Sequence, residues 1–147
     1  MALEKTDGYS SGEQFASEVI AALQKSQWGI AKPVPLVFYL YLPDEEAARS
    51  CVEAIQAVGL NVEVGPSANG DGKWLCLCKA RLVPETKRLT EIGSVLLSLA
   101  KEKNGQFDGW ETDLTELAKK GCLRLVVRLA IFLAIIVALL IYWLVKK

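Results

Sequence analysis

The sequence predicts an α+β domain in residues 11–113, followed by a single membrane-spanning helix. Three observations predict this organisation. They are a strand pattern in the middle of the chain, helical patterns that alternate with strand patterns around it, and an uninterrupted apolar run near the C-terminus. Residues 1–10 are predicted to be a flexible N-terminus, residues 114–122 a basic juxtamembrane linker, and residues 123–147 the membrane anchor.

The central strand pattern runs from Lys73 to Val83. Its even positions are all apolar, whereas its odd positions are apolar only at the centre. Because side chains alternate between the two faces of a strand, one face is predicted to be buried and the other half exposed. The backbone groups of this strand need hydrogen-bond partners, so the neighbouring segments are interpreted as a sheet and the helices that cover it.

A helix is predicted ahead of this unit, from Ser11 to Gln27. It follows from the Ser10-x-x-Glu13 spacing, which is typical of a helix start, and from one narrow apolar stripe. The stripe indicates that the helix lies on another element, which the sequence does not identify. Residues 28–35 are predicted to be an irregular linker, because two prolines disfavour regular structure there.

The segments that follow alternate as strand, helix, strand, strand, helix, strand. Asp44 is placed to cap the first of these two helices, and Gly59 to end it. The strands are predicted at Leu36–Leu42, Leu60–Val64, Lys73–Val83 and within 106–112, with helical stripes at 44–58 and 89–100. This order predicts a ferredoxin-like β-α-β-β-α-β sandwich with one sheet face covered by helices and the other left for a partner.

Charge and composition argue against several functions. Residues 1–118 carry 11 Lys+Arg and 17 Asp+Glu, a net charge of −6, and residues 119–147 carry six basic residues and no acidic one. An acidic domain is not expected to bind nucleic acid directly, since such binding rests on a basic patch. The chain also has no histidine and no phosphate-binding loop, so no catalytic residue, cofactor or metal site is predicted.

The four cysteines are Cys51, Cys76, Cys78 and Cys122. Their spacing shows no disulfide framework, and Cys76 and Cys78 are expected side by side on the buried face of the central strand. Half of a metal site is the alternative, but no second pair is present. Buried, reduced thiols in a reducing cytosol are predicted, and the sequence assigns the Cys76/Cys78 pair no role.

The apolar run comprises the 17 consecutive residues 129–145. A helix of this length covers about 25 Å, and one more turn from Leu125 brings it to the ~30 Å of a hydrocarbon core. A transmembrane helix is therefore predicted from Leu125 to Val145. Lys119, Lys120, Arg124 and Arg128 precede it, against two lysines after it, so the N-terminal domain is expected on the cytoplasmic side.

Two functional hypotheses follow from these patterns. In the first, the uncovered sheet face receives a protein segment through Tyr39, Tyr41, Leu75, Leu77, Lys79 and Arg81. In the second, the protein is an interaction or assembly module unrelated to RNA, with helix contacts in the bilayer through Ala130, Ala134 and Ala138. An RNA-recognition module shares the element order, but its third strand would carry aromatic residues where this chain has leucines.

The last predicted strand carries the motif Phe107-Asp108-Gly109-Trp110-Glu111-Thr112. Together with the element order from Ser11 onward, this motif resembles the regulator of ribonuclease activity B family, whose members inhibit ribonuclease E. The resemblance implies a non-catalytic bacterial protein that binds this ribonuclease and slows RNA degradation, here at the inner membrane. A purely structural role for the motif stays open, with Gly109 allowing a bend and Trp110 filling the end of the core.

Overall fold

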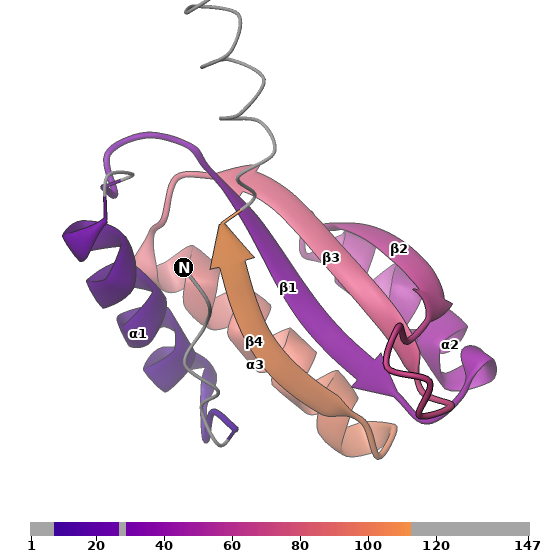
Figure 1. The fold of residues 1–147 in the computed structure, drawn as a ribbon. Coiled ribbons are helices and arrows are strands. Elements are labelled where there is room, and N and C mark those ends of the chain that lie inside the picture. Colours follow the sequence, from indigo (N-terminus) through magenta and orange to yellow (C-terminus); the bar gives the residue numbers. More distant parts are fainter. Residues whose placement is uncertain (1–7, 27–28, 113–147) are drawn as a thin grey trace, which may run out of the picture. The chain divides into compact units, whose positions relative to one another are not determined.

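The computed structural model describes residues 8–26 and 29–112, and the predicted anchor, Leu125 to Val145, lies outside them. The described part contains three helices and four strands, and their arrangement is shown in Figure 1. Their bounds are α1 Gly12–Lys25, β1 Val34–Leu42, α2 Glu45–Ala57, β2 Asn61–Pro66, β3 Trp74–Leu82, α3 Thr86–Glu102 and β4 Gln106–Thr112. None of these three helices is long and apolar enough to cross a bilayer.

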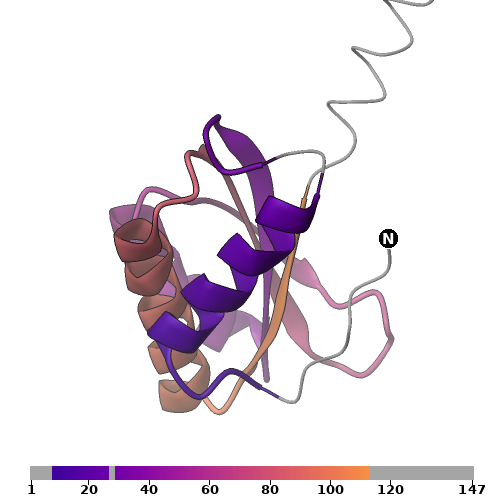
Figure 2. The ribbon, with the colours of Figure 1, turned by 90° about the vertical axis from the view of Figure 1, so that its left-hand side faces the viewer.

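The four strands form one antiparallel sheet in the order β2-β3-β1-β4. Strands β1 and β3 pair along their whole length, from Val34 opposite Leu82 to Leu42 opposite Trp74. Figure 2, which views the sheet from its side, shows α1 and α3 on one side of it. The predicted α+β fold with a ferredoxin-like order of elements is confirmed.

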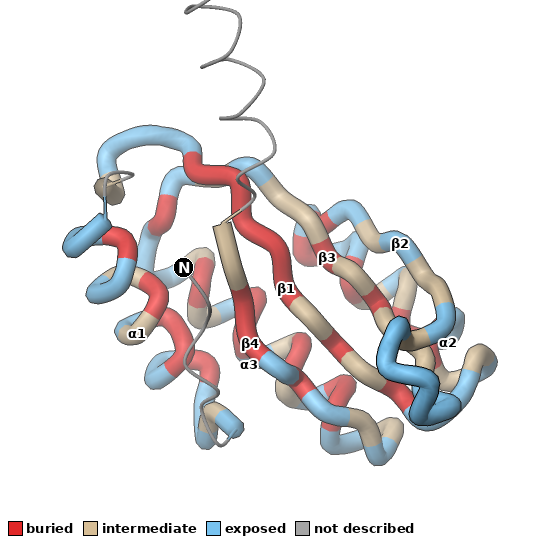
Figure 3. The backbone as a smooth tube through the Cα atoms, viewed as in Figure 1, coloured by how far each residue is buried: buried red, intermediate tan, exposed pale blue. Residues whose placement is uncertain are grey.

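The core lies between the sheet and the helices, and the strand patterns predicted it. The even positions of β1 are at most 1% exposed, and Cys76 and Cys78 of β3 are fully buried. In Figure 3 the tube along β1 is largely buried, in contrast to the exposed hairpin loop between β2 and β3. The odd positions of both strands therefore face the opposite side of the sheet.

Helix α1 packs on the helix side of the sheet, against α3 (Figure 2). Phe15 of α1 is fully buried, with its ring centroid 6.0 Å from that of Phe38 on β1 and 5.4 Å from that of Phe107 on β4. Close approach to α3 depends on glycine: a Cβ on Gly93 would lie 2.5 Å from the Phe15 ring. The face of the sheet opposite the helices is therefore not covered by α1.

Two local predictions within the first 35 residues were wrong. The N-cap of α1 is Ser11 rather than Ser10: its Oγ accepts from the Gln14 N–H at 3.2 Å, and Gln14 Oε1 accepts from Ser10. The capping side chains are therefore Ser11 and Gln14, each one residue after the Ser10 and Glu13 that the spacing indicated. A glutamine can accept the same backbone hydrogen bond as a glutamate at this position.

The predicted linker 28–35 also ends earlier than expected, since β1 begins at Val34 and includes Pro35. Pro35 pairs with Arg81 of β3. A proline at the second residue of a strand removes only one N–H near the end of the ladder, so it costs little hydrogen bonding.

The start of α2 agrees with the prediction. Asp44 Oδ1 accepts from the Ala47 N–H at 2.8 Å, and Glu45 and Glu46 occupy the first turn, where the helix dipole favours negative charge. At the other end Gly59 has φ +73°, a conformation that glycine adopts without strain. The sequence therefore sets both ends of this helix locally.

The contact between α1 and α3 yields a test of the packing. Gly93→Ala should lower the free energy of unfolding by about 1–3 kcal/mol, because the added Cβ overlaps the buried Phe15 ring. Helix propensity alone would raise the free energy of unfolding, since alanine stabilises a helix interior relative to glycine by roughly 0.5–1 kcal/mol.

Urea denaturation of the full chain in mild detergent measures this effect. Ser98→Ala, at an exposed position of α3, is the matched control and should be neutral or slightly stabilising. A Gly93→Ala protein as stable as the Ser98→Ala protein would contradict the close approach of the two helices.

Candidate functional site

The candidate site is the sheet face opposite the helices, called here the open face. The strand register arranges its residues in rows that cross the sheet. The rows, each read from β2 to β4, are Gly65-Leu75-Tyr41-Gln106, then Glu63-Leu77-Tyr39-Gly109, then Asn61-Lys79-Val37-Glu111, with Arg81 and Pro35 beyond them. All six predicted binding residues therefore lie on one face, in adjacent rows.

The first two rows form the apolar half of the open face. Tyr39, Tyr41, Leu75 and Leu77 meet there as two directly opposed cross-strand pairs, and all four are half-buried. Partly exposed aromatic and aliphatic side chains on one surface are the composition that protein interfaces favour. The structure thus brings together the four apolar residues that the sequence singled out.

The remaining rows carry charged residues, and their two positions on β1, Val37 and Pro35, are buried. Lys79 Nζ lies 2.9 Å from Glu63 Oε1, so the lysine is tied to the edge strand rather than extended into water. The Tyr39 hydroxyl donates to the Glu111 carboxylate on β4. Arg81 is exposed near the end of β3, at the border of the open face.

The motif of the last strand has a structural role in the fold. Phe107 and Trp110 are 5% and 8% exposed on the core side, while Asp108 has no partner on β1, because the register shifts between Tyr39 and Leu40. Gly109 has φ +106° at this bulge, and Thr112 pairs with Leu36 at the strand end. The bend at Gly109 and the filling of the core by Trp110 are both confirmed.

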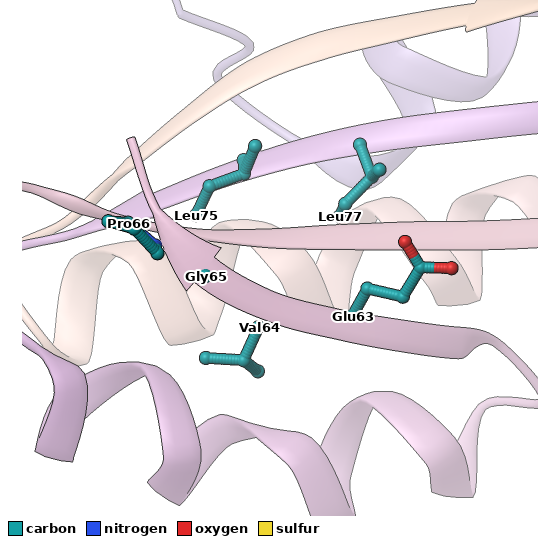
Figure 4. A pocket seen from close by; sticks show the side chains of 6 residues that line it. All are labelled: Glu63, Val64, Gly65, Pro66, Leu75 and Leu77. Carbon is teal, nitrogen blue, oxygen red and sulfur yellow. The ribbon is translucent and has the colours of Figure 1, made fainter. Parts of the chain in front are cut away.

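A shallow hollow on the open face was not predicted. It measures about 230 Å³ and is lined by Glu63, Val64, Gly65, Pro66, Leu75 and Leu77. In Figure 4 the side chains of Leu75, Leu77 and Glu63 rise on one side of the strands, while Val64 points to the other, toward a helix. The hollow exists because Gly65 has no side chain beside Leu75, and a Cβ there would meet no atom within 4 Å.

One feature of the sequence points to this hollow. The second strand is predicted to end at Val64, whereas β2 continues through Pro66 and so includes Gly65. A glycine inside a strand often marks a place where another group approaches closely. Reading the hairpin two residues longer would have placed Gly65 opposite Leu75.

The electrostatic environment is acidic at the apolar end of the open face. The pKa of Tyr41 is raised, chiefly by burial and further by the carboxylates of Asp108 and Asp71. Its hydroxyl therefore remains protonated at neutral pH and can donate a hydrogen bond. Asp71 has Lys73 as a loose ion-pair partner at 3.8 Å.

The thiols lie on the opposite side of the sheet and are held in the core. Cys51, Cys76 and Cys78 are free and fully buried, as predicted for core thiols. Burial raises the pKa of Cys76 to about 12, with the nearby Cys51 adding to the effect, and it also raises the pKa of Cys78. A thiol that stays protonated is a poor nucleophile, so these groups are packing residues.

The described residues contain no group of three or more His, Cys, Asp or Glu side chains that could hold a metal ion. Within residues 8–26 and 29–112, no charged or polar side chain is buried.

The fold and the site define an α+β sandwich domain with one sheet face uncovered by its own helices. Residues 13–112 match the family described as Regulator of ribonuclease activity B, and the chain belongs to this family. The match spans all four strands and nearly all of α1. No curated protein matches the sequence.

The buried thiols generate a prediction about alkaline stability. An unfolded thiol loses its proton near pH 9, whereas folded Cys76 holds its proton to about pH 12. Above pH 9 the unfolded state therefore binds fewer protons, so the free energy of unfolding should fall by roughly 1.4 kcal/mol per pH unit for each such thiol. Below pH 9 the thiols should contribute no pH dependence.

Denaturant titrations between pH 7 and 11 on the Cys122→Ser chain measure this slope. Cys78→Ala in the same background should be less stable at pH 8, because a buried sulfur is lost, yet its stability should fall less steeply above pH 9. Equal slopes for the two proteins would show that Cys78 does not contribute to the alkaline loss of stability.

Proposed function

We propose that this protein is a membrane-anchored, non-catalytic regulator that binds a ribonuclease of the ribonuclease E type and slows RNA degradation. The observation that carries the proposal is the family match, which extends over residues 13–112 and so over nearly the whole described fold. Regulation of ribonuclease activity is what the family's description states. Binding to ribonuclease E and inhibition of it are the steps that the proposal adds.

The open face supports a binding mechanism. Its half-buried apolar rows remain accessible because α1 packs on the helix side of the sheet, through Phe15. A partner that covers Tyr39, Tyr41, Leu75 and Leu77 would remove apolar area from water, which favours association by about 25 cal/mol per Å² before the costs of binding. Lys79 and Arg81 would lie at the rim of such an interface.

Charge and tethering support the same mechanism. Residues 1–118 carry a net charge of −6, which would steer the domain toward a basic segment of the ribonuclease. The apolar run 129–145 would anchor the protein in the bacterial inner membrane, with the domain in the cytoplasm. A ribonuclease at the same membrane would then meet the domain at a raised local concentration.

The proposal predicts that the full chain in lipid nanodiscs slows cleavage of an RNA substrate by purified ribonuclease E. Binding should weaken as salt rises from about 0.05 to 0.5 M, because exposed charges are screened over roughly 10 Å at 0.1 M. Leu77→Glu should weaken binding by at least about tenfold, since it places a charge in the apolar half of the open face.

Ala22→Glu is the matched control, because it adds the same charge at an exposed position of α1, on the other side of the molecule. It should bind as the unmodified chain does. A chain that neither binds ribonuclease E nor changes its cleavage rate, even at low salt and high concentration, would refute the ribonuclease function and favour an assembly module. Loss of self-association in Ala134→Leu would then support that alternative.

A further inference from the structure

The two edges of the sheet differ, and the difference points to where a partner binds. The β4 edge is interrupted by the bulge at Asp108 and Gly109, and a Cβ on Gly109 would lie 3.8 Å from the Tyr9 hydroxyl. A bulge disturbs the regular pairing of an edge strand with another chain. The β4 edge therefore carries one such protection, the bulge.

The β2 edge has little such protection against pairing with another chain. In the part of the chain that the structure describes, no strand lies beyond β2. Its pairing with β3 is regular from Asn61 to Pro66, without a bulge. It contains no lysine, and its one proline is its last residue. The Ser67 N–H donates to the Lys73 carbonyl, so the even positions of β2 face outward. Val62 and Val64 present both an N–H and a C=O there, and Pro66 a C=O, which another strand can pair with.

The hollow beside Gly65 borders this same edge. An added strand would place alternate side chains on the open face, one beside Gly65 and the next beside Glu63. Beside Gly65 such a side chain would meet Leu75 and Leu77 across the hollow of about 230 Å³. The site therefore fits an aliphatic or aromatic side chain at this position.

Beside Glu63 the requirement is electrostatic. The Glu63 side chain is 68% exposed although it pairs with Lys79, so its carboxylate can accept a second cation. The net charge of −6 on residues 1–118 favours a basic partner over an acidic one. A lysine or arginine two residues from the apolar anchor satisfies this position.

We propose that β2 binds an extended segment of its partner by strand addition, with an apolar side chain in the hollow beside Gly65 and a basic side chain, two residues further on, at Glu63. The added strand runs antiparallel to β2, as all neighbouring strands of this sheet do. The identity of the partner as a ribonuclease rests on the proposed function. The chemistry of the segment rests on this edge alone.

The first arm of the test uses the full chain in nanodiscs and purified ribonuclease E. Gly65→Leu fills the hollow without a clash in the fold, and it should weaken binding by at least about tenfold. Ala68→Leu adds the same side chain at an exposed position of the adjacent loop and should leave the affinity unchanged. If Gly65→Leu binds as tightly as Ala68→Leu does, the hollow is not the site.

The charge is tested by a swap. Glu63→Lys should weaken binding by about tenfold. The double variant Glu63→Lys, Lys79→Glu restores the ion pair within the domain, with the two charges exchanged. The double variant should stay weak if Glu63 meets a basic side chain of the partner. Full recovery in the double variant would mean that Glu63 acts only by holding Lys79, and would overturn the assignment.

Hydrogen exchange distinguishes strand addition from other contacts. Binding should slow exchange of the outward amides within residues 61–66, and binding without this protection would overturn strand addition even where the ribonuclease is inhibited. If these amides are protected in the absence of the partner, and the protection rises with the concentration of the chain, then a second copy of the chain binds this edge. That result would overturn the proposal.

A chain that does not bind ribonuclease E at all would refute the proposed function separately. The edge is then probed with a synthetic heptapeptide, Thr-Val-Thr-Leu-Thr-Lys-Thr, whose leucine and lysine take the two proposed positions in an antiparallel strand. Protection of residues 61–66 by this peptide, but not by the version with glutamate for lysine, would support the proposal. Equal protection by both, or by neither, would overturn it.

Discussion

The packing of Phe15 decides which side of this molecule remains available. Its ring contacts Phe38 of the sheet and Phe107 of the last strand, and it fits against α3 only because residue 93 is glycine. Tyr9 adds an edge-on contact with the same ring, at a centroid distance of 5.1 Å. Offset and edge-to-face aromatic pairs of this kind contribute about 0.5–1.5 kcal/mol each beyond the burial of their area. The leading helix is thereby fixed on the helix side of the sheet, and the open face is left free of it.

The sequence was sufficient for the parts of the fold that local chemistry determines. Alternation along β1 and β3 identified the buried face, and Asp44 and Gly59 marked the ends of α2. The six residues predicted for the open face share it, because a side-chain period of two leaves no other arrangement once the core face is known. These inferences needed no contact between distant segments.

What the sequence could not predict depends on such contacts. The place of α1 follows from a ring that fits beside Gly93, and nothing in the local pattern of either helix reveals that fit. Pro35 belongs to β1 rather than to the linker because it pairs with Arg81 of β3. Gly65 lies in a strand because its pairing with Leu75 outweighs the turn preference of Gly-Pro. In each case the deciding interaction joins residues that are far apart in the chain.

Gly109 and Gly65 both lie on the open face, one near each edge of the sheet, and their surroundings differ. The space left by Gly109, opposite Tyr39, lies close to the Tyr9 hydroxyl, whereas the space beside Gly65 is empty. Beside the empty space the charged side chains are already paired, since Lys79 is bound to Glu63. Immobilising a flexible side chain on binding costs about 0.5–1.5 kcal/mol, so an ordered rim reduces the cost that a partner must overcome. The core thiols stay protonated and buried on the other side of the sheet, so the recognition proposed for the open face and its β2 edge does not involve them.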